Sequence, residues 1–271
     1  MSSQPAARLP TWFVSHGGGP WPWLPEMGPM MAGLAKSLRD LPSTLPSRPK
    51  AVLLVSAHWE EPAFTLMSHP RPPMLYDYYG FPRQTYEIVY PAPGEPSLAA
   101  RVRDLIAGAS LPAALDAVRG FDHGAFVPMA VAWPDASMPI VQLSLRAGLD
   151  AAMHLALGRA LAPLRDEGVL IVGSGLTWHN LRALGPQARV PSQQFDAWLQ
   201  QTVTSPAAER AARLLRWTEA PAARAAHPRE EHLLPLMVAA GAALDDAGAC
   251  PYSEENVYGG VTVSSFRFGA V

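Results

Sequence analysis

The chain has 271 residues, of which 49% are hydrophobic and 16% charged, and its formal net charge at pH 7 is −2. This length suffices for one large α/β domain or two small ones, and the near-zero charge gives no electrostatic basis for nucleic acid or an anionic membrane as main partner. Cys250 is the only cysteine, which excludes an internal disulfide and a thiolate metal cluster and favours a reducing, cytoplasmic location.

The N-terminal third predicts a strand, a helix and a second strand. Residues 1–10 contain no apolar segment typical of a signal peptide, and no later run approaches the ~18 apolar residues of a membrane span. Residues 11–16 predict a strand that ends at His16, before a glycine loop. Residues 26–40 have helical spacing, and 52–60 predict a strand buried on both faces. This order favours a right-handed crossover and a parallel sheet.

The middle of the chain contains a long irregular segment, residues 69–96, which is rich in Pro, Tyr and Gly. Such segments are uncommon in compact domains unless they cover a site. We interpret residues 76–82 as one aromatic wall of a pocket, although a rigid surface loop explains the pattern equally well. Strands are predicted over 64–67, 139–145 and 169–173, and helices over 97–109 and 149–166.

The C-terminal third is predicted to be mainly helical. Residues 192–215 indicate helix interrupted near Pro206, 233–244 a further helix, and 261–268 an alternating final strand. We find no internal repeat and no clean linker. The expected fold is therefore a single α/β domain, residues 1–271, with a central, mostly parallel sheet flanked by helices and its site at the C-terminal ends of the strands.

Three predicted strands deliver a histidine at or just beyond their C-terminal ends: His16, His58 and His179. Ligand crevices of open α/β sheets lie at this edge, and neutral imidazole is the commonest protein metal ligand. Without thiolates, such a site would use nitrogen and oxygen ligands and suit Fe(II), Zn(II) or Mn(II). The alternative for His16 is a turn cap that bonds a backbone carbonyl.

Two further histidines are candidates for chemistry. His232 stands at or just before a predicted helix, so either this side chain or the carboxylate of Glu230 or Glu231 is a candidate third ligand. His123, like His179, lies in a loop and is a candidate general base near neutral pH. The remaining histidines receive no site role: His69, His154 and His227.

Several catalytic motifs are absent or incomplete. No His-Glu-x-x-His occurs, which disfavours a zincin-type metalloprotease. The glycines after His16 lack the spacing of a phosphate-binding loop, and residues 172–176 lack the second glycine of a serine-hydrolase nucleophile elbow.

An ordered set of short motifs resembles the class III extradiol ring-cleavage dioxygenases, specifically the 4,5-DOPA dioxygenase branch. The resemblance runs from about residue 11 to the last strand, and the ordered set is far more specific than any single motif. The motifs are Ser15-His16-Gly17-Gly18-Gly19-Pro20, Ser56-Ala57-His58-Trp59, Tyr79-Gly80-Phe81-Pro82, Tyr90-Pro91-Ala92-Pro93-Gly94, Gly120-Phe121-Asp122-His123-Gly124, Trp178-His179-Asn180 and Glu231-His232-Leu233-Leu234-Pro235-Leu236.

The resemblance implies a mononuclear non-haem Fe(II) held by His16, His58 and His232. Many class III enzymes have two histidines and a glutamate, so Glu231 stays open as the third ligand. His179 is implied to lie next to the metal, as acid/base or as a fourth ligand when Zn(II) occupies the site, and His123 to be an acid/base or substrate contact. A neutral three-histidine site makes capture of Zn(II) during purification plausible.

The implied activity opens the ring of a DOPA-like or related catechol with O2 to a muconic semialdehyde. Tyr76 and Phe81 are expected to pack against the substrate ring. The expected partners are the catechol and O2, not nucleic acid or a membrane, and the chain is expected to be a monomer or small homo-oligomer. Two other functions stay open: a non-enzymatic binding protein on the same scaffold, and a zinc-dependent hydrolase.

Overall fold

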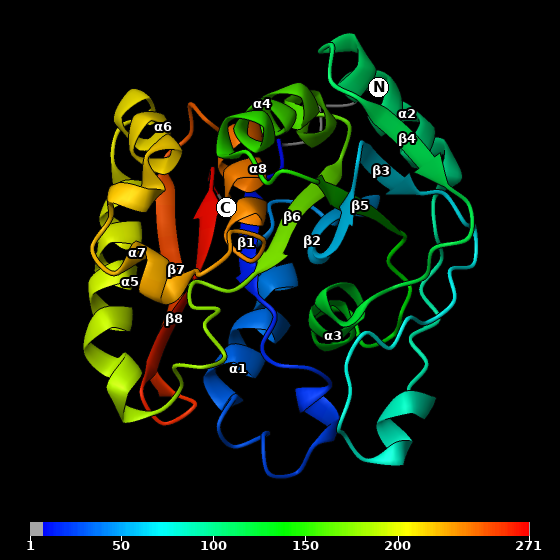
Figure 1. Cartoon of the computed structure of the whole chain (residues 1–271). Helices are drawn as coiled ribbons and strands as arrows, with labels where there is room; N and C mark the ends of the chain where they lie inside the picture. The colour runs from blue at the N-terminus through cyan, green and yellow to red at the C-terminus, as the bar shows by residue number, and fades with distance from the viewer. Residues whose placement is uncertain (1–7, 271) are drawn as a thin grey trace.

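The protein is built on one eight-stranded sheet (Figure 1). The computed structural model describes residues 8–270. The prediction that residues 1–10 contain no signal peptide falls mostly outside these described residues. The strand order is β4-β3-β5-β2-β6-β1-β8-β7. The strands are β1 (Thr11–Ser15), β2 (Ala51–Glu61), β3 (Phe64–Met67), β4 (Ala113–Asp116), β5 (Ile140–Arg146), β6 (Val169–Gly175), β7 (Gly248–Val257) and β8 (Val261–Phe268).

The centre of the sheet is parallel, which confirms the predicted fold class. Strands β5, β2, β6 and β1 all run in the same direction. On one side β3 is antiparallel to β5, and on the other β8 is antiparallel to β1 and β7 to β8. Every residue of β1 and β6 is buried, as expected for strands with cover on both faces.

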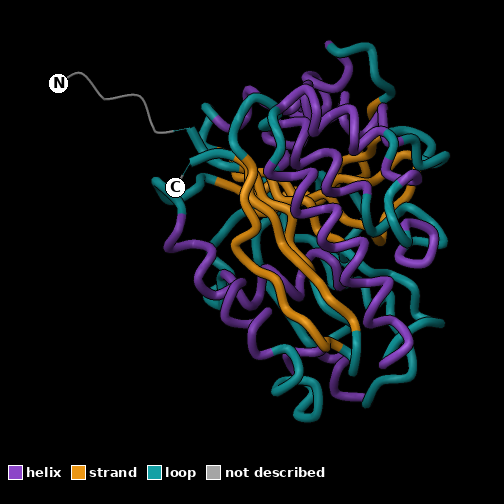
Figure 2. The backbone as a smooth tube through the Cα atoms, turned by 90° about the vertical axis from the view of Figure 1, so that its left-hand side faces the viewer, coloured by secondary structure: helices purple, strands orange, loops and turns teal. Residues whose placement is uncertain are grey.

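Helices cover both faces of the sheet, as the side view in Figure 2 shows. In β6, Gly173 and Gly175 face the residues before and within α8, whereas the Ser174 side chain bonds the start of α3. Alternate residues of a strand face opposite sides, so α8 and α3 lie on opposite faces. The α-helices are α1 (Ala32–Asp40), α2 (Pro96–Gly108), α3 (His123–Ala132), α4 (Ala151–Leu161), α5 (Arg189–Thr204), α6 (Ala207–Leu215), α7 (Ala223–Ala226) and α8 (Leu234–Ala242).

Proline positions explain where the helix predictions succeed and fail. The break between α5 and α6 falls at Pro206, as predicted. Helix α1 begins at Ala32 rather than at residue 26, because Pro25 and Pro29 hold the preceding segment in turns. Helix α4 ends at Leu161, and Pro163 lies in a separate 3₁₀ turn. Among residues 8–270, no helix has the length and apolar character needed to cross a bilayer.

Strand β2 continues to Glu61, so His58 lies inside the strand and not at or just beyond its end, as the sequence had indicated. Its pairing with β5 is interrupted between Val55 and Glu60, and His58 lies within this irregular stretch. Such irregularities bend a strand and change the direction of its side chains. The local break is thus what aims His58 across the end of the sheet.

Candidate metal centre

Three imidazole rings meet at the C-terminal ends of the central strands. The Nε2 atom of His58 lies 3.1 Å from Nε2 of His16 and 3.2 Å from Nε2 of His232. The ring centroids of His16 and His232 are 5.3 Å apart. The structure therefore brings together side chains that come from the end of β1, from β2 and from the segment before α8.

Glycines in β6 allow the segment that carries His232 to lie directly on the strand. A Cβ atom at Gly175 would collide with the carbonyl oxygen of His232, and one at Gly173 with the carbonyl oxygen of Pro235. The same carbonyl of His232 accepts a hydrogen bond from the Leu176 N–H at 3.1 Å. Close backbone approach, rather than side-chain packing, thus positions this histidine.

His16 is fixed by a tight turn at the end of β1. Its N–H donates to Gly175 O at 3.1 Å, and its carbonyl oxygen accepts from Trp21 Nε1 at 2.8 Å. Gly17 has a φ of +76°, a conformation that favours glycine, and its missing side chain leaves room for the indole of Trp21. The predicted turn after His16 is present, but the His16 ring itself faces His58 rather than capping a carbonyl.

The Nδ1 atoms of the three rings all have acceptors nearby. Ser174 Oγ donates to Gly124 O and therefore accepts from His16 Nδ1, at 3.1 Å. His232 Nδ1 donates to Glu231 Oε1 at 3.0 Å, and His58 Nδ1 lies 3.5 Å from Asp77 Oδ2. With the proton on Nδ1, each ring presents a bare Nε2 lone pair to the others.

This arrangement fits a metal ion. Three facing lone pairs repel one another unless a cation lies between them. Two imidazole nitrogens bound to one ion at about 2.1 Å lie about 3.0 Å apart at a right angle and about 3.4 Å apart in a tetrahedron. The separations of 3.1 and 3.2 Å between the Nε2 atoms fall in this range.

The charge state of the three rings also suits a metal. Burial lowers the pKa of His58 to about 3, with the neighbouring His123 as the next cause. Burial likewise holds the pKa values of His16 and His232 well below 6.5, and the other histidines of the cluster add to the effect. All three imidazoles are therefore neutral at pH 7, the form that binds metal ions.

Two more histidines flank the three, each held by a carboxylate. His123 Nδ1 lies 2.8 Å from Asp77 Oδ1, which also accepts from the His123 N–H at 2.9 Å. His179 Nδ1 lies 2.9 Å from Glu231 Oε1, and its ring stacks on His232 with a centroid distance of 3.2 Å. The Nε2 atoms of both histidines are left free to exchange protons with a bound molecule.

Both carboxylates are ionised. Burial alone would raise the pKa of Asp77, but the hydrogen bond and charge of His123 outweigh it, and the pKa is lowered. The pKa of Glu231 is likewise lowered, because the hydrogen bond from His179 outweighs burial. Glu231 thus uses its Oε1 to bond two imidazoles, while His232 is the residue whose nitrogen faces His16 and His58.

The histidine cluster opens into a cavity of about 780 Å³. Phe81, Tyr78 and Tyr79 from the segment 69–96 line it, so this segment forms an aromatic wall as interpreted from the sequence. Tyr76 does not line the cavity; its hydroxyl donates to Ile88 O at 2.6 Å and its ring packs against Tyr78. Tyr76 therefore supports the wall from behind.

Some residues around the site had no clear signal in the sequence. Asp77 stands within the motif region 76–82, but nothing in the sequence pairs it with His123. Ser174 was visible only as part of an incomplete hydrolase motif. The remaining histidines lie outside the cluster: His227 is buried with Nε2 3.1 Å from Thr177 O, His154 is buried between Asp150 and Arg146, and His69 lies on a surface loop.

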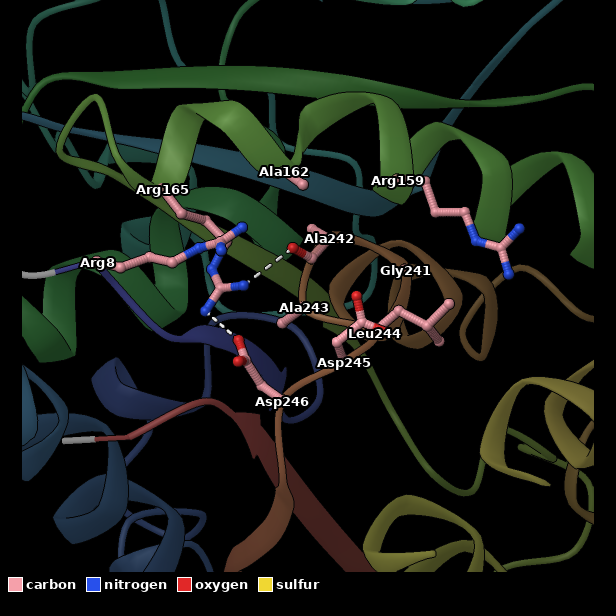
Figure 3. Close-up of a pocket in the computed structure, with 10 residues that line it drawn as sticks. All are labelled: Arg8, Arg159, Ala162, Arg165, Gly241, Ala242, Ala243, Leu244, Asp245 and Asp246. Carbon is pink, nitrogen blue, oxygen red and sulfur yellow. Dashed lines mark hydrogen bonds and ion pairs between the residues drawn. The ribbon is translucent and has the colours of Figure 1, made fainter. Parts of the chain in front are cut away.

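A second cavity, of about 280 Å³, lies near the end of α8 (Figure 3). Its lining includes an arginine that joins two segments of the chain. The buried Arg165 crosses it and donates to Ala242 O at 3.2 Å and to the carboxylate of Asp246. It also donates to Leu9 O at 2.7 Å. This guanidinium therefore ties the segment before β1 to the end of α8.

Comparison with known proteins points to one family. Residues 27–269 match the family described as the catalytic LigB subunit of aromatic ring-opening dioxygenase. The chain is 40% identical to a 4,5-DOPA dioxygenase extradiol of Beta vulgaris, with 88% of each chain covered. It is 35% identical to the protein of that name in Escherichia coli, with 88% of this chain and 86% of the other covered.

Two further matches extend over almost the whole chain. Dioxygenase tasH of Hapsidospora irregularis is 37% identical over 96% of this chain and 85% of its own length. The crystal structure of an uncharacterized protein from Escherichia coli K12 superposes with a TM-score of 0.77 and 30% identity, covering 97% of this chain and all of that one.

Proposed function

The chain belongs to the LigB family of class III extradiol dioxygenases and is an extradiol ring-cleavage dioxygenase, and from this premise we propose that it uses Fe(II) and O2 to open a catechol ring to a muconic semialdehyde. The observation that carries the proposal is the meeting of three imidazole Nε2 atoms in the lining of the cavity. Catechols are the proposed substrate class, and residues 1–271 are proposed to act as one catalytic unit.

In this proposal His16, His58 and His232 hold the metal, with His179 as a further ligand when Zn(II) replaces Fe(II). A bound metal ion lowers the pKa of a coordinated hydroxyl and brings the two reactants together. The donor set supports nitrogen ligation, and Glu231 is already engaged by two Nδ1 atoms. His232 rather than Glu231 is therefore our third ligand.

His179 is proposed as the general base. Its Nδ1–H donates to Glu231, so the free Nε2 can accept the proton of a catechol hydroxyl bound beside it. Glu231 Oε1, at 2.9 Å, holds the ring through its Nδ1–H. The stacking on His232 keeps the base next to the ligand set.

His123 is proposed as the second acid/base group and a substrate contact. Asp77 orients its ring through Nδ1, and the ring can return a proton to an oxygen of the ring-opened product. Phe81 packs against the substrate ring, and Tyr76 acts indirectly by supporting Tyr78.

The family match and the relatives named as dioxygenases disfavour the two alternative functions, a non-enzymatic binding protein and a zinc-dependent hydrolase. We also propose that the catechol and O2 are the only partners required, with no role for nucleic acid or a membrane. The protein would act in the cytoplasm as a monomer or small homo-oligomer. Its low net charge and single cysteine support this view.

The test is anaerobic reconstitution with Fe(II), followed by a catechol and then air. The proposal expects one O2 consumed per catechol and a yellow semialdehyde absorbance. No O2 uptake with any catechol, from DOPA to protocatechuate, would refute the proposed function.

Three variants assign the roles. His58→Ala should abolish metal binding, whereas His69→Ala, on a surface loop, should change neither metal content nor turnover. His179→Ala should keep much of the metal and lose turnover by about 100-fold or more. Full turnover in His179→Ala would show that another group is the base.

A further inference from the structure

The catalytic cavity offers little to an anionic substituent. Among residues 8–270, Arg229 is the only Lys or Arg in the lining of this cavity. Its Nη1 and Nη2 atoms lie 2.5 and 2.6 Å from the two carboxylate oxygens of Glu60, and Nη1 also lies 3.5 Å from Glu231 Oε2. Such a two-point pair fills the side of the guanidinium that a substrate carboxylate would need.

The remaining charged groups in the lining are carboxylates. Asp77 and Glu231 are bound to histidines, and Glu60 is bound to Arg229. A carboxylate on the substrate would therefore approach three negative groups, and two donors of Arg229 are already engaged by Glu60. Both effects discriminate against anionic substrates.

Much of the rest of the lining is apolar or aromatic. Besides the histidines, the cavity is lined by apolar and aromatic side chains from four separate segments of the chain. These side chains are Met27, Phe81, Leu176, Trp178, Leu181, Leu184 and Tyr258. Leu181 is 69% exposed and Tyr79, also in the lining, is 91% exposed. An apolar substituent on a bound ring would cover exposed groups of this kind.

Two glycines bring the aromatic side chains close to the loop that follows His16. A Cβ atom at Gly18 would lie 2.6 Å from the Tyr258 hydroxyl oxygen, and one at Gly19 2.7 Å from Phe81 Cζ. Any side chain at either position would push these rings outward. The glycine loop therefore lets aromatic rings, rather than polar side chains of the loop, form this border.

The size of the cavity agrees with a substituted ring. At about 780 Å³ it is in the range of pockets that bury most of a drug-sized ligand, far larger than a bare catechol requires. The space beyond the histidines must therefore be filled by a substituent or by water.

We propose that the preferred substrates are catechols with an uncharged, apolar aryl or alkyl substituent, and that catechols carrying a carboxylate, including amino-acid catechols, are poor substrates. This inference rests on the proposed function and narrows it. Specificity comes from burial of the substituent against the apolar lining and from the Glu60–Arg229 pair, which already engages the arginine of the lining.

The experiment compares kcat/KM for O2 uptake across 4-methylcatechol, 4-propylcatechol, 4-phenylcatechol, protocatechuate and DOPA, using the Fe(II)-loaded protein. Each added methylene should raise kcat/KM about threefold, and 4-phenylcatechol should exceed both carboxylated substrates by about tenfold or more. Isothermal titration of the same compounds into Zn(II)-loaded protein should give the same order of affinity.

The outcomes separate the two claims. If no catechol consumes O2 but titration gives the expected order, the proposed function fails and the substrate inference stands. If catechols are opened but DOPA or protocatechuate is preferred over 4-phenylcatechol, the inference is overturned and the function stands.

Two variants test the charge argument directly. Glu60→Gln should release Arg229 and raise kcat/KM for protocatechuate about tenfold. Leu181→Lys, at a position that is 69% exposed, should also raise kcat/KM for protocatechuate, because it adds a cation to the lining. Glu87→Gln is the matched control, because it removes a surface ion pair with Arg83 outside the cavity. It should leave kcat/KM unchanged for both protocatechuate and 4-phenylcatechol. Failure of both Glu60→Gln and Leu181→Lys to improve protocatechuate would overturn the inference.

Discussion

The carboxylate of Glu231 accepts a hydrogen bond from Nδ1 of His179 at 2.9 Å. The same oxygen lies 3.0 Å from Nδ1 of His232, so one carboxylate holds a proposed base and a proposed ligand. Asp77 likewise contacts one proposed acid/base group and one proposed ligand. Its carboxylate lies 2.8 Å from Nδ1 of His123 and 3.5 Å from Nδ1 of His58. Each proposed proton-transfer group is therefore positioned relative to the metal by a carboxylate that it shares with a ligand.

Replacement of Glu231 by Gln should weaken metal binding about 10- to 100-fold, the usual effect of losing a hydrogen-bond partner of ligating histidines. The amide carries no charge and cannot hold two Nδ1–H groups equally well. A competition titration with a zinc chelator measures the change. Glu230→Gln is the matched control, since Glu230 pairs with Arg224 and does not line the cavity. Equal affinities for the two variants would contradict the role assigned to Glu231.

Replacement of Gly175 by Ala should displace the backbone at His232 and reduce metal stoichiometry, because the new methyl group would collide with that carbonyl oxygen. We expect a loss of about 2 kcal/mol in the free energy of unfolding as well, within the range for overpacking. Gly108→Ala is the control, since nothing lies within 4 Å of its added Cβ. Metal analysis and urea unfolding provide the measurement. Unchanged metal content in Gly175→Ala would count against backbone contact as the positioning device.

Replacement of Arg165 by Met should lower the free energy of unfolding by about 3 kcal/mol, because the carbonyls of Leu9 and Ala242 and the carboxylate of Asp246 lose a buried donor. Arg159→Met, at an exposed arginine of the same cavity, should cost less than about 0.5 kcal/mol. Metal binding should be unaffected in both variants. A similar loss of unfolding free energy in both variants would contradict the stabilising role assigned to the buried hydrogen bonds of Arg165.

Acid should destabilise the protein partly through His154. Burial lowers its pKa to about 4, opposed by the hydrogen bond to Asp150 O. Between pH 6.5 and about 4 the unfolded chain binds a proton at this residue that the folded protein does not. Stability is therefore full above pH 6.5 and falls, by up to about 3 kcal/mol, as the pH drops toward 4.

The variant His154→Gln isolates this contribution. Its free energy of unfolding in urea should depend less steeply on pH between 6.5 and 4 than that of the wild type. Gln can still accept from the Arg146 N–H or donate to Asp150 O, so the fold is retained. Parallel pH profiles for the two proteins would show that His154 is protonated in the folded state.

The sequence predicts the centre of the fold well and its edges poorly. Strands β1 and β6 are largely apolar runs, because cover on both faces favours such residues, and these runs predict them. Strand β4 is only four residues long, and β7 is polar with a proline and two irregularities in its pairing. Edge strands of this kind are specified by their neighbours rather than by their own residues.

For the site, the residues that end buried strands could be named from the sequence, because parallel topology brings those ends together. His232 and His123 do not end strands, so the residues alone made them candidates with alternatives left open, and the resemblance then assigned their roles. The hydrogen bonds of Asp77 and Ser174 could not be predicted, because each joins segments far apart in the chain: Asp77 to His123, and Ser174 to His16. The pairing of Arg229 with Glu60 spans 169 positions and has no local signal either.

The most direct test is an anomalous diffraction map from crystals of the metal-loaded protein, recorded at the absorption edges of iron and zinc. We expect one anomalous peak that lies about 2.1 Å from the Nε2 atoms of His16, His58 and His232. A peak bound through Glu231 in place of His232, or no peak among these rings in a protein that retains ring-opening activity, would contradict the proposed metal centre.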